Sequence, residues 1–459
     1  MATSDYIRTF DRLAMEDVPS VGGKTASLGE LHRLLKRGPV HVPDGFAITA
    51  GAYRDALTRA GAWPRLADLM ARVDVADVED LARRAAAARE IVYAATDWPE
   101  LAADIIAAFH GLKAQCGDEL SVAVRSSATA EDLPTASFAG QHDSFLHIRD
   151  EAALVEACRR CFASLFTDRA IVYRLNNGFD HLKVALSVAV MQMVRSDEAA
   201  SGVIFTLDTE SGFRDVVFVT GAYGLGENVV QGRVDPDEWY VHKPTYRSGV
   251  RAVLRRTLGG KQTRVTWKAG GVADLRTRPV PRSERESFCL SDDEVVELAG
   301  VAMRIEDHYS KRAGRPTPMD IEWAKDAVDG RLYVVQARPE TVASRRGAEV
   351  ESFRLRGSGE VLAVGKAIGE RVAAGAVRVV RGADDLKAFR PGEVLVAAAT
   401  NPDWEPVLKT AAAVVTDRGG RTCHAAIVAR ELGVPAIVGT GDATRRLLEG
   451  RRVTVSCAE

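Results

Sequence analysis

A histidine within "GGRTCHAAIVAR", residues 419–430, is the first residue whose surroundings suggest chemistry. His424 follows Cys423 directly, so it could be a nucleophile, a metal ligand, a base for the thiol or a packed core residue. A metal site needs further ligands at suitable spacing, and the nearest other histidine is His308, in a distant segment. Neighbouring side chains on a helix point about 100° apart, which prevents His424 from facing the thiol.

The position of His424 along the chain favours the nucleophile. We expect a helix with Thr422 as its N-cap, so that His424 lies in the first turn. Unpaired backbone N–H groups and the positive end of the helix dipole favour an anion there and disfavour imidazolium. A neutral imidazole in this place is a good nucleophile, and a phosphoryl group on it would be stabilised. Gly419 and Gly420 leave the approach open, while a core histidine stays the alternative.

Two glycines and a lysine in "VGGKTASLGE" form a second candidate. Gly22 and Gly23 could present backbone N–H groups to an anion while Lys24 supplies positive charge. The segment is no Walker A loop, because Val18 stands where that pattern needs glycine and no apolar strand precedes it. Alone, such a triplet most often marks a turn.

An arginine in "VRSSATAEDLPTASFAGQ" forms a third candidate. We predict a short strand over residues 121–125, so that Arg125 leaves its end into a loop of hydroxyl residues that reaches Gly140. Such a loop could fold over phosphate oxygens with a bidentate guanidinium beneath them. A solvated polar loop with a salt-bridging arginine explains the segment equally well.

A hairpin is predicted in "DIEWAKDAVDGRLYVVQAR", because alternating segments flank the turn signal Asp329-Gly330. Asp320 and Glu322 share one face of the first strand. If the turn centres near Asp329, Gln336 lies opposite Glu322 and Arg338 opposite Asp320. Carboxylate and amide oxygens suit Mg²⁺, and the guanidinium suits phosphate. The alternative is a surface charge pair across the strands.

The elements that must position these residues alternate between helix and strand, which predicts an α/β fold in an α+β multidomain arrangement. We expect a large domain over residues 1–342, with lobes at roughly 1–200 and 201–342. Polar residues 343–359 are interpreted as a linker and hinge. A small domain is then expected over residues 360–459, with one helix from near Thr422 to near Gly433. Its five short β-branched strands are predicted at "AVRVV", "EVLVA", "AAAVVT", "PAIVG" and "RVTVS".

Composition limits the classes of function. The chain has 459 residues and a formal charge of −2. Its net charge therefore gives no strong positive electrostatic field that would bind nucleic acid or an anionic membrane. No apolar run is long enough to cross a bilayer, and the N-terminus lacks the pattern of a signal peptide. We therefore expect a cytoplasmic protein with no nucleic-acid or membrane partner. The CxxC of Cys158 and Cys161 lies in a helical pattern and is interpreted as two structural thiols.

The joint motifs resemble the phosphoenolpyruvate-utilising enzymes. "GGRTCHAAIVARELGVPAIVG" resembles the phosphohistidine signature of that family. Further motifs resemble one branch of it, the phosphoenolpyruvate synthases, over nearly the whole chain. These motifs include "VGGKTASLGE", "VRSSATAEDLPTASFAGQ", "FASLFTDRAIVYR", "GLGENVVQG", "PMDIEWAKD", "VQARPETV" and "NPDWEPVLK".

This resemblance implies an ATP-grasp-type nucleotide-binding module followed by a swivelling phosphohistidine domain. In the family, the histidine takes phosphate from ATP, with release of AMP and inorganic phosphate, and passes it to pyruvate. Carried over by motif, His424 is the phosphorylated residue. The ATP-binding set comprises Lys24, Arg125, Gly140, Gln192, Glu322, Gln336 and Arg338. The Mg²⁺ set comprises Glu322, Gln336 and, less strongly, Asp320.

Two features depart from the family pattern. Met191 stands where the family commonly has glutamine, so the adenine contact is left between that position and the neighbouring Gln192. The sequence ends at Glu459, within what the family continues as the histidine domain. We therefore expect a domain truncated at its C-terminus, with pyruvate or phosphoenolpyruvate bound only through a missing C-terminal domain or a separate chain. A homodimer is kept as a candidate assembly.

Three other functions remain open. A rifampin-type antibiotic phosphotransferase shares both modules but places a substrate domain between them, for which this chain has little room. A fragment of pyruvate phosphate dikinase would require inorganic phosphate as co-substrate. A regulatory module would bind ATP without chemistry, although nearly all the expected polar positions are filled.

Overall fold

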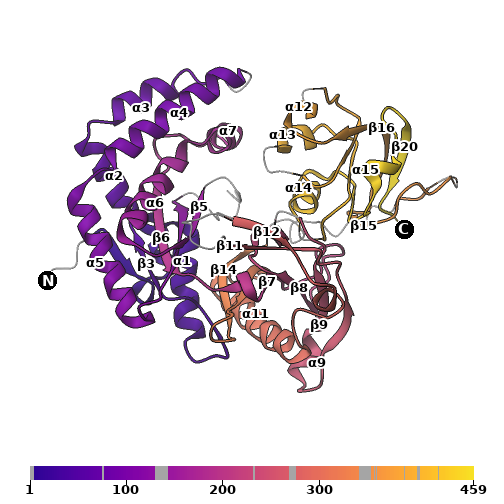
Figure 1. Ribbon diagram of the computed structural model, residues 1–459, viewed down its shortest axis with the longest axis horizontal. Helices are drawn as coiled ribbons and strands as arrows, with labels where there is room; N and C mark the ends of the chain where they lie inside the picture. The colour runs from indigo at the N-terminus through magenta and orange to yellow at the C-terminus, as the bar shows by residue number, and fades with distance from the viewer. Residues whose placement is uncertain are drawn as a thin grey trace. The chain divides into compact units, whose positions relative to one another are not determined.

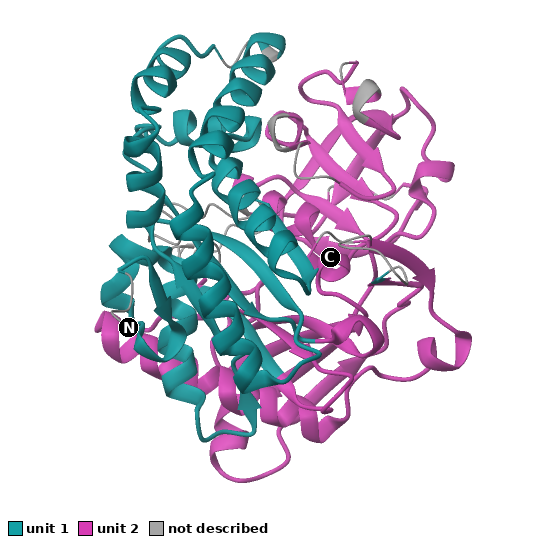
Figure 2. Cartoon of the chain, turned by 60° about the vertical axis from the view of Figure 1, so that its left-hand side comes forward, with its two compact units in different colours: residues 1–194, 267–274, 333–338 teal, residues 195–266, 275–332, 339–459 magenta. Residues whose placement is uncertain are grey.

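The chain folds into a mixed α/β structure with two compact units (Figure 2). The first unit consists of residues 1–194, 267–274 and 333–338, and the second of residues 195–266, 275–332 and 339–459. The computed structural model describes residues 5–74, 77–129, 143–230, 233–267, 275–340, 353–355, 357, 359–386, 388–400, 404–421 and 423–458. Among these residues, no helix is long and apolar enough to cross a membrane.

The first unit is built on a five-stranded antiparallel sheet in the order β1-β3-β6-β4-β5. Figure 1 labels β3, β6 and β5 of this sheet. Its strands are β1 (Ile7–Thr9), β3 (Gly45–Ile48), β4 (Val122–Ala128), β5 (Ser144–Ile148) and β6 (Leu186–Gln192). Two further strands are β2 (Val40–His41) and β14 (Leu332–Pro339). The helices are α1 (Val18–Leu35), α2 (Ala50–Arg59), α3 (Trp63–Met70), α4 (Val78–Ala95), α5 (Pro99–Cys116), α6 (Glu151–Ala163) and α7 (Asp168–Asn176).

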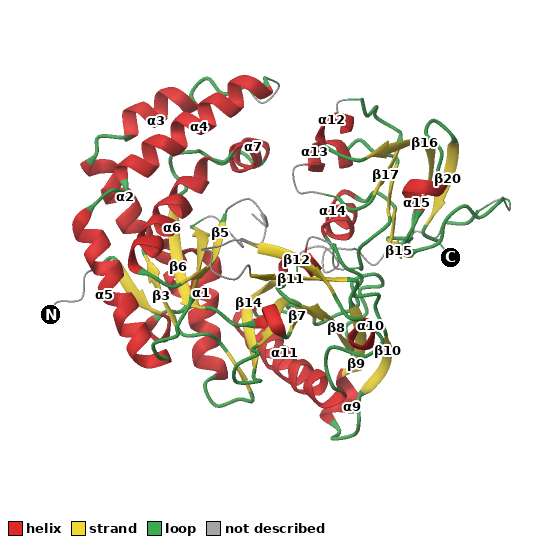
Figure 3. Cartoon of the chain, viewed as in Figure 1, coloured by secondary structure: helices red, strands yellow, loops and turns green. Residues whose placement is uncertain are grey.

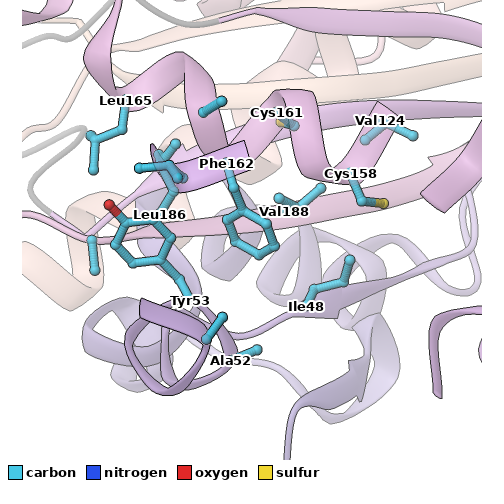
Figure 4. Packing of buried hydrophobic residues seen from close by; sticks show 14 of the residues in the cluster. Ile48, Ala52, Tyr53, Val124, Cys158, Cys161, Phe162, Leu165, Leu186 and Val188 are labelled. Carbon is cyan, nitrogen blue, oxygen red and sulfur yellow. The ribbon is translucent and has the colours of Figure 1, made fainter. Parts of the chain in front are cut away.

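Helix α6 packs its apolar side chains onto this sheet, as its helical spacing predicts. Cys158 and Cys161 are both buried, at 1% and 0% exposure, which confirms that the CxxC is structural. Figure 4 shows Phe162 of the same helix beside Tyr53 of α2, with 5.6 Å between the ring centroids. The two rings fill the space between helices and strands, so the sheet has a continuous apolar core on this face.

An arginine and a histidine are buried together at the end of α7. Arg174 is 0% exposed, and its Nε donates to Nδ1 of His181 at 2.9 Å. Its Nη1 donates to the carbonyl oxygen of Leu165 at 2.6 Å. Burial and the nearby guanidinium lower the pKa of His181 to about 4. The folded chain therefore holds this imidazole neutral at pH 7.

This pair predicts a loss of stability in acid. An unfolded histidine has its ordinary pKa of about 6.5, so between pH 6.5 and 4 the unfolded chain binds a proton that the folded chain does not. Stability therefore falls as the pH drops through this window, by about 2–3 kcal/mol at pH 4.5. Denaturant unfolding at pH 7.5 and 4.5 measures this loss. His181→Gln keeps an acceptor for Arg174 and should reduce the difference; an unchanged difference would contradict the assignment.

The second unit contains an antiparallel run of strands in the order β10-β9-β8-β7-β13, with helix α11 against it. Figure 3 labels β7 to β10 and α11. The strands are β7 (Ala200–Phe205), β8 (Val216–Tyr223), β9 (Asp237–His242), β10 (Val253–Thr257) and β13 (Met319–Lys325). The helices are α8 (Glu227–Val230), α9 (Lys243–Arg247), α10 (Arg282–Arg285) and α11 (Asp292–Ala313). Helix α11 has a capping box between Ser291 and Glu294, which satisfies backbone N–H groups at its start.

Residues 259–286, which the sequence suggests are an extended surface insertion, are more ordered than expected. They contain β11 (Thr263–Trp267) and β12 (Leu275–Pro279), which form a two-stranded sheet, and helix α10. Lys261 is 0% exposed and pairs with the equally buried Asp237. The prediction of an extended, surface-lying insertion is therefore only partly right, because this ion pair buries the start of the segment whereas β12 is largely exposed.

Residues 360–458 belong to the second unit, and we call this part of the unit the C-terminal domain. It has a six-stranded sheet in the order β15-β19-β18-β17-β16-β20. Strands β16 to β19 pair in parallel, and β15 and β20 are antiparallel edges. All five predicted strands of this region are confirmed. The strands are β15 (Lys366–Ile368), β16 (Val372–Val380), β17 (Val394–Ala397), β18 (Ala413–Thr416), β19 (Ala436–Val438) and β20 (Arg452–Ser456). The helices are α12 (Ala383–Leu386), α13 (Glu405–Leu408), α14 (His424–Leu432) and α15 (Ala443–Arg446). Most of the predicted linker over residues 343–359 lies outside the described residues.

Candidate functional site

The glycine pair before Lys24 lies at a kink of α1, where two helical segments meet at Gly22. Gly22 has a φ of +74°, and a Cβ placed there would lie 2.4 Å from the carbonyl oxygen of Ser127. The backbone N–H of Thr25 donates to Oγ of Ser127 at 3.1 Å. Only glycine permits this approach of helix to strand, and Lys24 lies between the two residues, Gly22 and Thr25, that contact Ser127 of β4.

Arg125 lies within β4 and not at its end. The predicted strand was too short, because Ser126 and Ser127 continue the antiparallel ladder with β6 and are buried. The Nη1 of Arg125 donates to the carbonyl oxygen of Val335 at 3.1 Å, and its Nη2 donates to Oε1 of Gln336 at 2.7 Å. A rigid strand therefore holds the guanidinium against β14.

Helix α1 and strands β4 and β14 converge in the first unit. Beyond the contacts of Arg125, Oγ of Ser27 donates to the carbonyl oxygen of Ala337 at 2.8 Å. The structure thus brings together the elements that carry Lys24, Arg125 and Gln336, which are far apart in the sequence. Arg338 follows on the same face of β14 as Gln336, because successive strand residues alternate between faces. Two arginines and a lysine on converging elements suit an anionic ligand.

The two candidate carboxylates lie in the second unit, on β13. Met319, Ile321 and Trp323 are buried, whereas Asp320 and Glu322 are half-buried, which confirms the predicted alternation. A turn follows between residues 326 and 331, where Gly330 has a φ of +73° as the turn signal requires. The predicted pairing of Glu322 with Gln336 and of Asp320 with Arg338 stays a prediction.

A metal ion at these carboxylates would need additional oxygen ligands. Among the described residues, no group of three or more His, Cys, Asp or Glu side chains could hold a metal by itself. Two carboxylates are nevertheless what Mg²⁺ commonly takes from a protein when phosphate oxygens supply other positions. The donor set therefore fits a cation that binds together with a nucleotide.

Three further residues were considered on the ATP side, and the structure describes two of them. Gln192 ends β6, is half-buried, and its Oε1 accepts from Sγ of Cys116 at 3.9 Å. Met191 is 2% exposed and belongs to the core. Gly140 lies outside the described residues. Gln192 is thus the more accessible of the two neighbours considered for the adenine contact.

His424 is the first residue of α14 in the C-terminal domain. The N-cap is Cys423, with an extended φ of −73° and ψ of 162°, so the prediction of Thr422 as N-cap was wrong by one residue. The predicted placement of His424 in the first turn and the end of the helix at Gly433 are confirmed. Apolar residues of α14 pack against β18 and β19, which orients the start of the helix.

His424 and the neighbouring thiol of Cys423 have different surroundings. Burial raises the pKa of Cys423, which is 2% exposed, so the thiol stays neutral. The Nδ1 of His424 lies 3.1 Å from Oγ1 of Thr400, a hydrogen bond that fixes the ring. Thr400 is buried in the segment after β17. Sequence reasoning missed Thr400, since a lone threonine 24 positions upstream gives no signal.

Comparison with protein families gives two matches. Residues 18–356 match the model described as pyruvate phosphate dikinase, AMP/ATP-binding domain. Residues 389–459 match the PEP-utilising enzyme, mobile domain. The first match covers the converging elements with Lys24, Arg125 and Gln336, and the second covers His424.

Curated relatives resemble the chain along nearly its whole length. Phosphoenolpyruvate synthase of Pseudomonas aeruginosa is 54% identical over 99% of this chain, and that of Escherichia coli is 50% identical over 100%. The chain spans 57% of the length of each. Among solved structures, an L-amino acid ligase from Bacillus licheniformis matches 55% of this chain and 53% of its own, at 14% identity. Its TM-score of 0.20 carries no argument about the fold.

Proposed function

The chain belongs to the pyruvate phosphate dikinase family of phosphoenolpyruvate-utilising enzymes, and from this premise we propose that it phosphorylates His424 with ATP. The proposed reaction is the first half of phosphoenolpyruvate synthesis, in which ATP, pyruvate and water give AMP, phosphoenolpyruvate and phosphate. The observation that supports it most directly is the place of His424 at the start of α14, with its Nδ1 held by Thr400. Transfer to pyruvate is proposed for the whole protein, because the relatives are named phosphoenolpyruvate synthases.

We propose that residues 1–342 form the ATP-binding part, with an ATP-grasp-type fold, and that residues 360–459 swivel about the segment at 343–359. The phosphate contacts proposed are Lys24, Arg125 and Arg338, and the lid loop is proposed to include Gly140. Gln192 is proposed on the adenine side. The ligands proposed for Mg²⁺ are Glu322 and Gln336, with Asp320 as a weaker one. When bound, this ion would neutralise charge on the phosphates.

The proposed transfer of the β-phosphoryl group to His424 has two steps. Nε2 of His424 attacks the β-phosphorus of ATP, the bond between the α- and β-phosphates breaks, and AMP leaves. The β- and γ-phosphates are then both on His424. Water attacks the γ-phosphorus, the bond from this phosphorus to the bridging oxygen breaks, inorganic phosphate leaves, and the β-phosphoryl group stays on His424. For Nε2 to present its lone pair, Nδ1 must carry the proton and donate it to Thr400. The N–H groups at the start of α14 stabilise the added negative charge.

Labelled nucleotide tests this proposal. Incubation with [β-³²P]ATP should label His424, and incubation with [γ-³²P]ATP should leave the protein unlabelled while inorganic phosphate carries the label. Phosphopeptide mapping by mass spectrometry locates the group. Retention of the γ label alone would exclude a dikinase mechanism.

Thr400→Val is expected to slow the labelling of His424 about tenfold, because it removes the acceptor that selects the ring tautomer. Valine matches threonine in shape, so α14 should stay in place. The measurement is the rate of incorporation of β-phosphate across a pH series. Thr400→Ser restores the hydroxyl and should return the rate close to that of the unchanged chain. Equal rates for the valine and serine variants would assign Thr400 a packing role only.

A further inference from the structure

The C-terminal domain contacts acidic side chains elsewhere in the second unit. Nζ of Lys366, at the start of β15, lies 2.8 Å from Oδ1 of Asp235 and 2.8 Å from Oε1 of Glu238. The Lys366 side chain is 24% exposed, so water reaches this contact only in part. One ammonium group shared by two carboxylates gives a charge-assisted contact stronger than a single surface pair.

A second pair joins the same parts of the chain. Arg430, near the end of α14, pairs through Nη2 with Oε1 of Glu210, and its side chain is 4% exposed. Oε2 of Glu210 accepts from the backbone N–H of Gly369 at 3.1 Å. Glu210 therefore contacts the C-terminal domain with both oxygens. We call Glu210, Asp235 and Glu238 the acidic dock.

Asp235 of the acidic dock is held in place by contacts outside the C-terminal domain. Oδ2 of Asp235 accepts from the backbone N–H of Gly260 at 3.1 Å, so that Oδ1 is directed to Lys366. The backbone N–H of Lys261 donates to the carbonyl oxygen of Asp235 at 3.0 Å. Below this surface lies the fully buried pair of Lys261 with Asp237. These contacts fix the carboxylate without any help from the C-terminal domain.

The segment just before His424 lies on the same surface. Nη1 of Arg421 donates to Oη of Tyr240 at 3.0 Å. A Cβ at Gly420 would lie 2.8 Å from Cδ of Pro236, which leaves space there for glycine only. The ion pairs and this close approach therefore locate the histidine-bearing helix as well as the edge of the sheet.

We propose that the acidic dock is a specific and reversible binding site for the C-terminal domain, which contacts it through Lys366 and Arg430. The occupant is residues 360–458 of the same chain, since their two cations match the three carboxylates in position and sign. This inference rests on the proposed function, in which that domain moves between two places. The contact of Lys366 with Asp235 is partly open to water and therefore weakens with salt. It can thus stabilise one position of the C-terminal domain and still allow the domain to leave it.

Hydrogen–deuterium exchange of the full chain tests the acidic dock, because the amide of Gly369 is bonded to it. Lys366→Glu should speed exchange in a peptide containing residues 366–370 about tenfold, and 0.5 M salt should act in the same direction. Lys366→Glu combined with Glu238→Lys should restore protection to within about threefold. Arg452→Glu makes the same charge reversal on β20, the other edge of the sheet, and should change nothing.

Every outcome of the exchange measurements supports or contradicts the proposed acidic dock. Unchanged exchange in Lys366→Glu, or no rescue by the double variant, would overturn the proposal, provided that thermal unfolding shows the variants to be folded. If Lys366→Glu does not fold, Lys366→Gln carries the same comparison with a smaller expected effect. Labelling of His424 is measured in parallel. An unchanged chain that takes no label from ATP but shows the expected exchange pattern would contradict the proposed function and support the acidic dock.

Discussion

His424→Ala is expected to abolish incorporation of phosphate from [β-³²P]ATP, by at least about a thousandfold relative to the unchanged chain. The substitution removes the only atom proposed to form a bond to phosphorus, so no slower route to the same product remains. His424 begins α14, where alanine is readily accommodated, and we expect little change in stability. Label bound to protein after brief incubation measures the effect, and phosphohistidine is recognised by its lability in acid.

Cys423→Ala is the matched control, because it changes the adjacent side chain within the same packed domain. The neutral, buried thiol has no part in the proposed transfer, so this variant should keep at least half of the labelling rate. Label that persists in His424→Ala and disappears in Cys423→Ala would place the phosphate on sulfur. That result would contradict both the site and the mechanism.

The C-terminal domain could be predicted well from the sequence, because its signals are local. Five runs of β-branched residues bounded by glycine give the five predicted strands. Gly433, in the left-handed conformation with a φ of +66°, ends α14 where the sequence predicts. The N-cap was misplaced by one residue, since Thr422 is the stronger capping type and its neighbour holds the capping backbone conformation.

The contacts that assemble the ATP-side candidates could not be predicted in the same way. Arg125 and Gln336 are 211 positions apart, and nothing in either segment specifies the partner. The end of β4 was misjudged because serines in a polar run resemble a loop, although Ser127 is buried and accepts a hydrogen bond from α1. Family resemblance grouped these residues by role, whereas the structure shows which of them lie on converging elements.

The acidic dock had no sequence signal at all. Lys366 and Arg430 are single cations in a chain with 61 lysines and arginines, and their partners lie more than a hundred positions upstream. Charge pairs of this kind depend on how whole strands are placed. They therefore emerge only when the backbone is known.

Arg125→Ala is expected to lower the rate of His424 labelling by about a hundredfold to a thousandfold. The guanidinium donates to Val335 and Gln336 and thereby fixes β14, and we propose that it also contacts the phosphates of ATP. Its removal leaves a carbonyl and an amide oxygen without these donors, at a cost to stability of about 1–3 kcal/mol. The labelling rate, the affinity for ATP and the denaturation midpoint are measured on the same preparation.

The Arg125→Lys variant tests whether positive charge at this position is sufficient or the planar guanidinium is required. Lysine keeps the positive charge but cannot reach Val335 and Gln336 with a planar fork, so we expect it to recover less than a tenth of the lost rate. Arg149→Ala is the control, since it removes an exposed arginine of the same unit and should leave labelling unchanged. If Arg125→Lys labels as fast as the unchanged chain, charge alone suffices and the strand-held fork is not required. If Arg125→Ala does so too, the converging elements of the first unit have no part in phosphate binding.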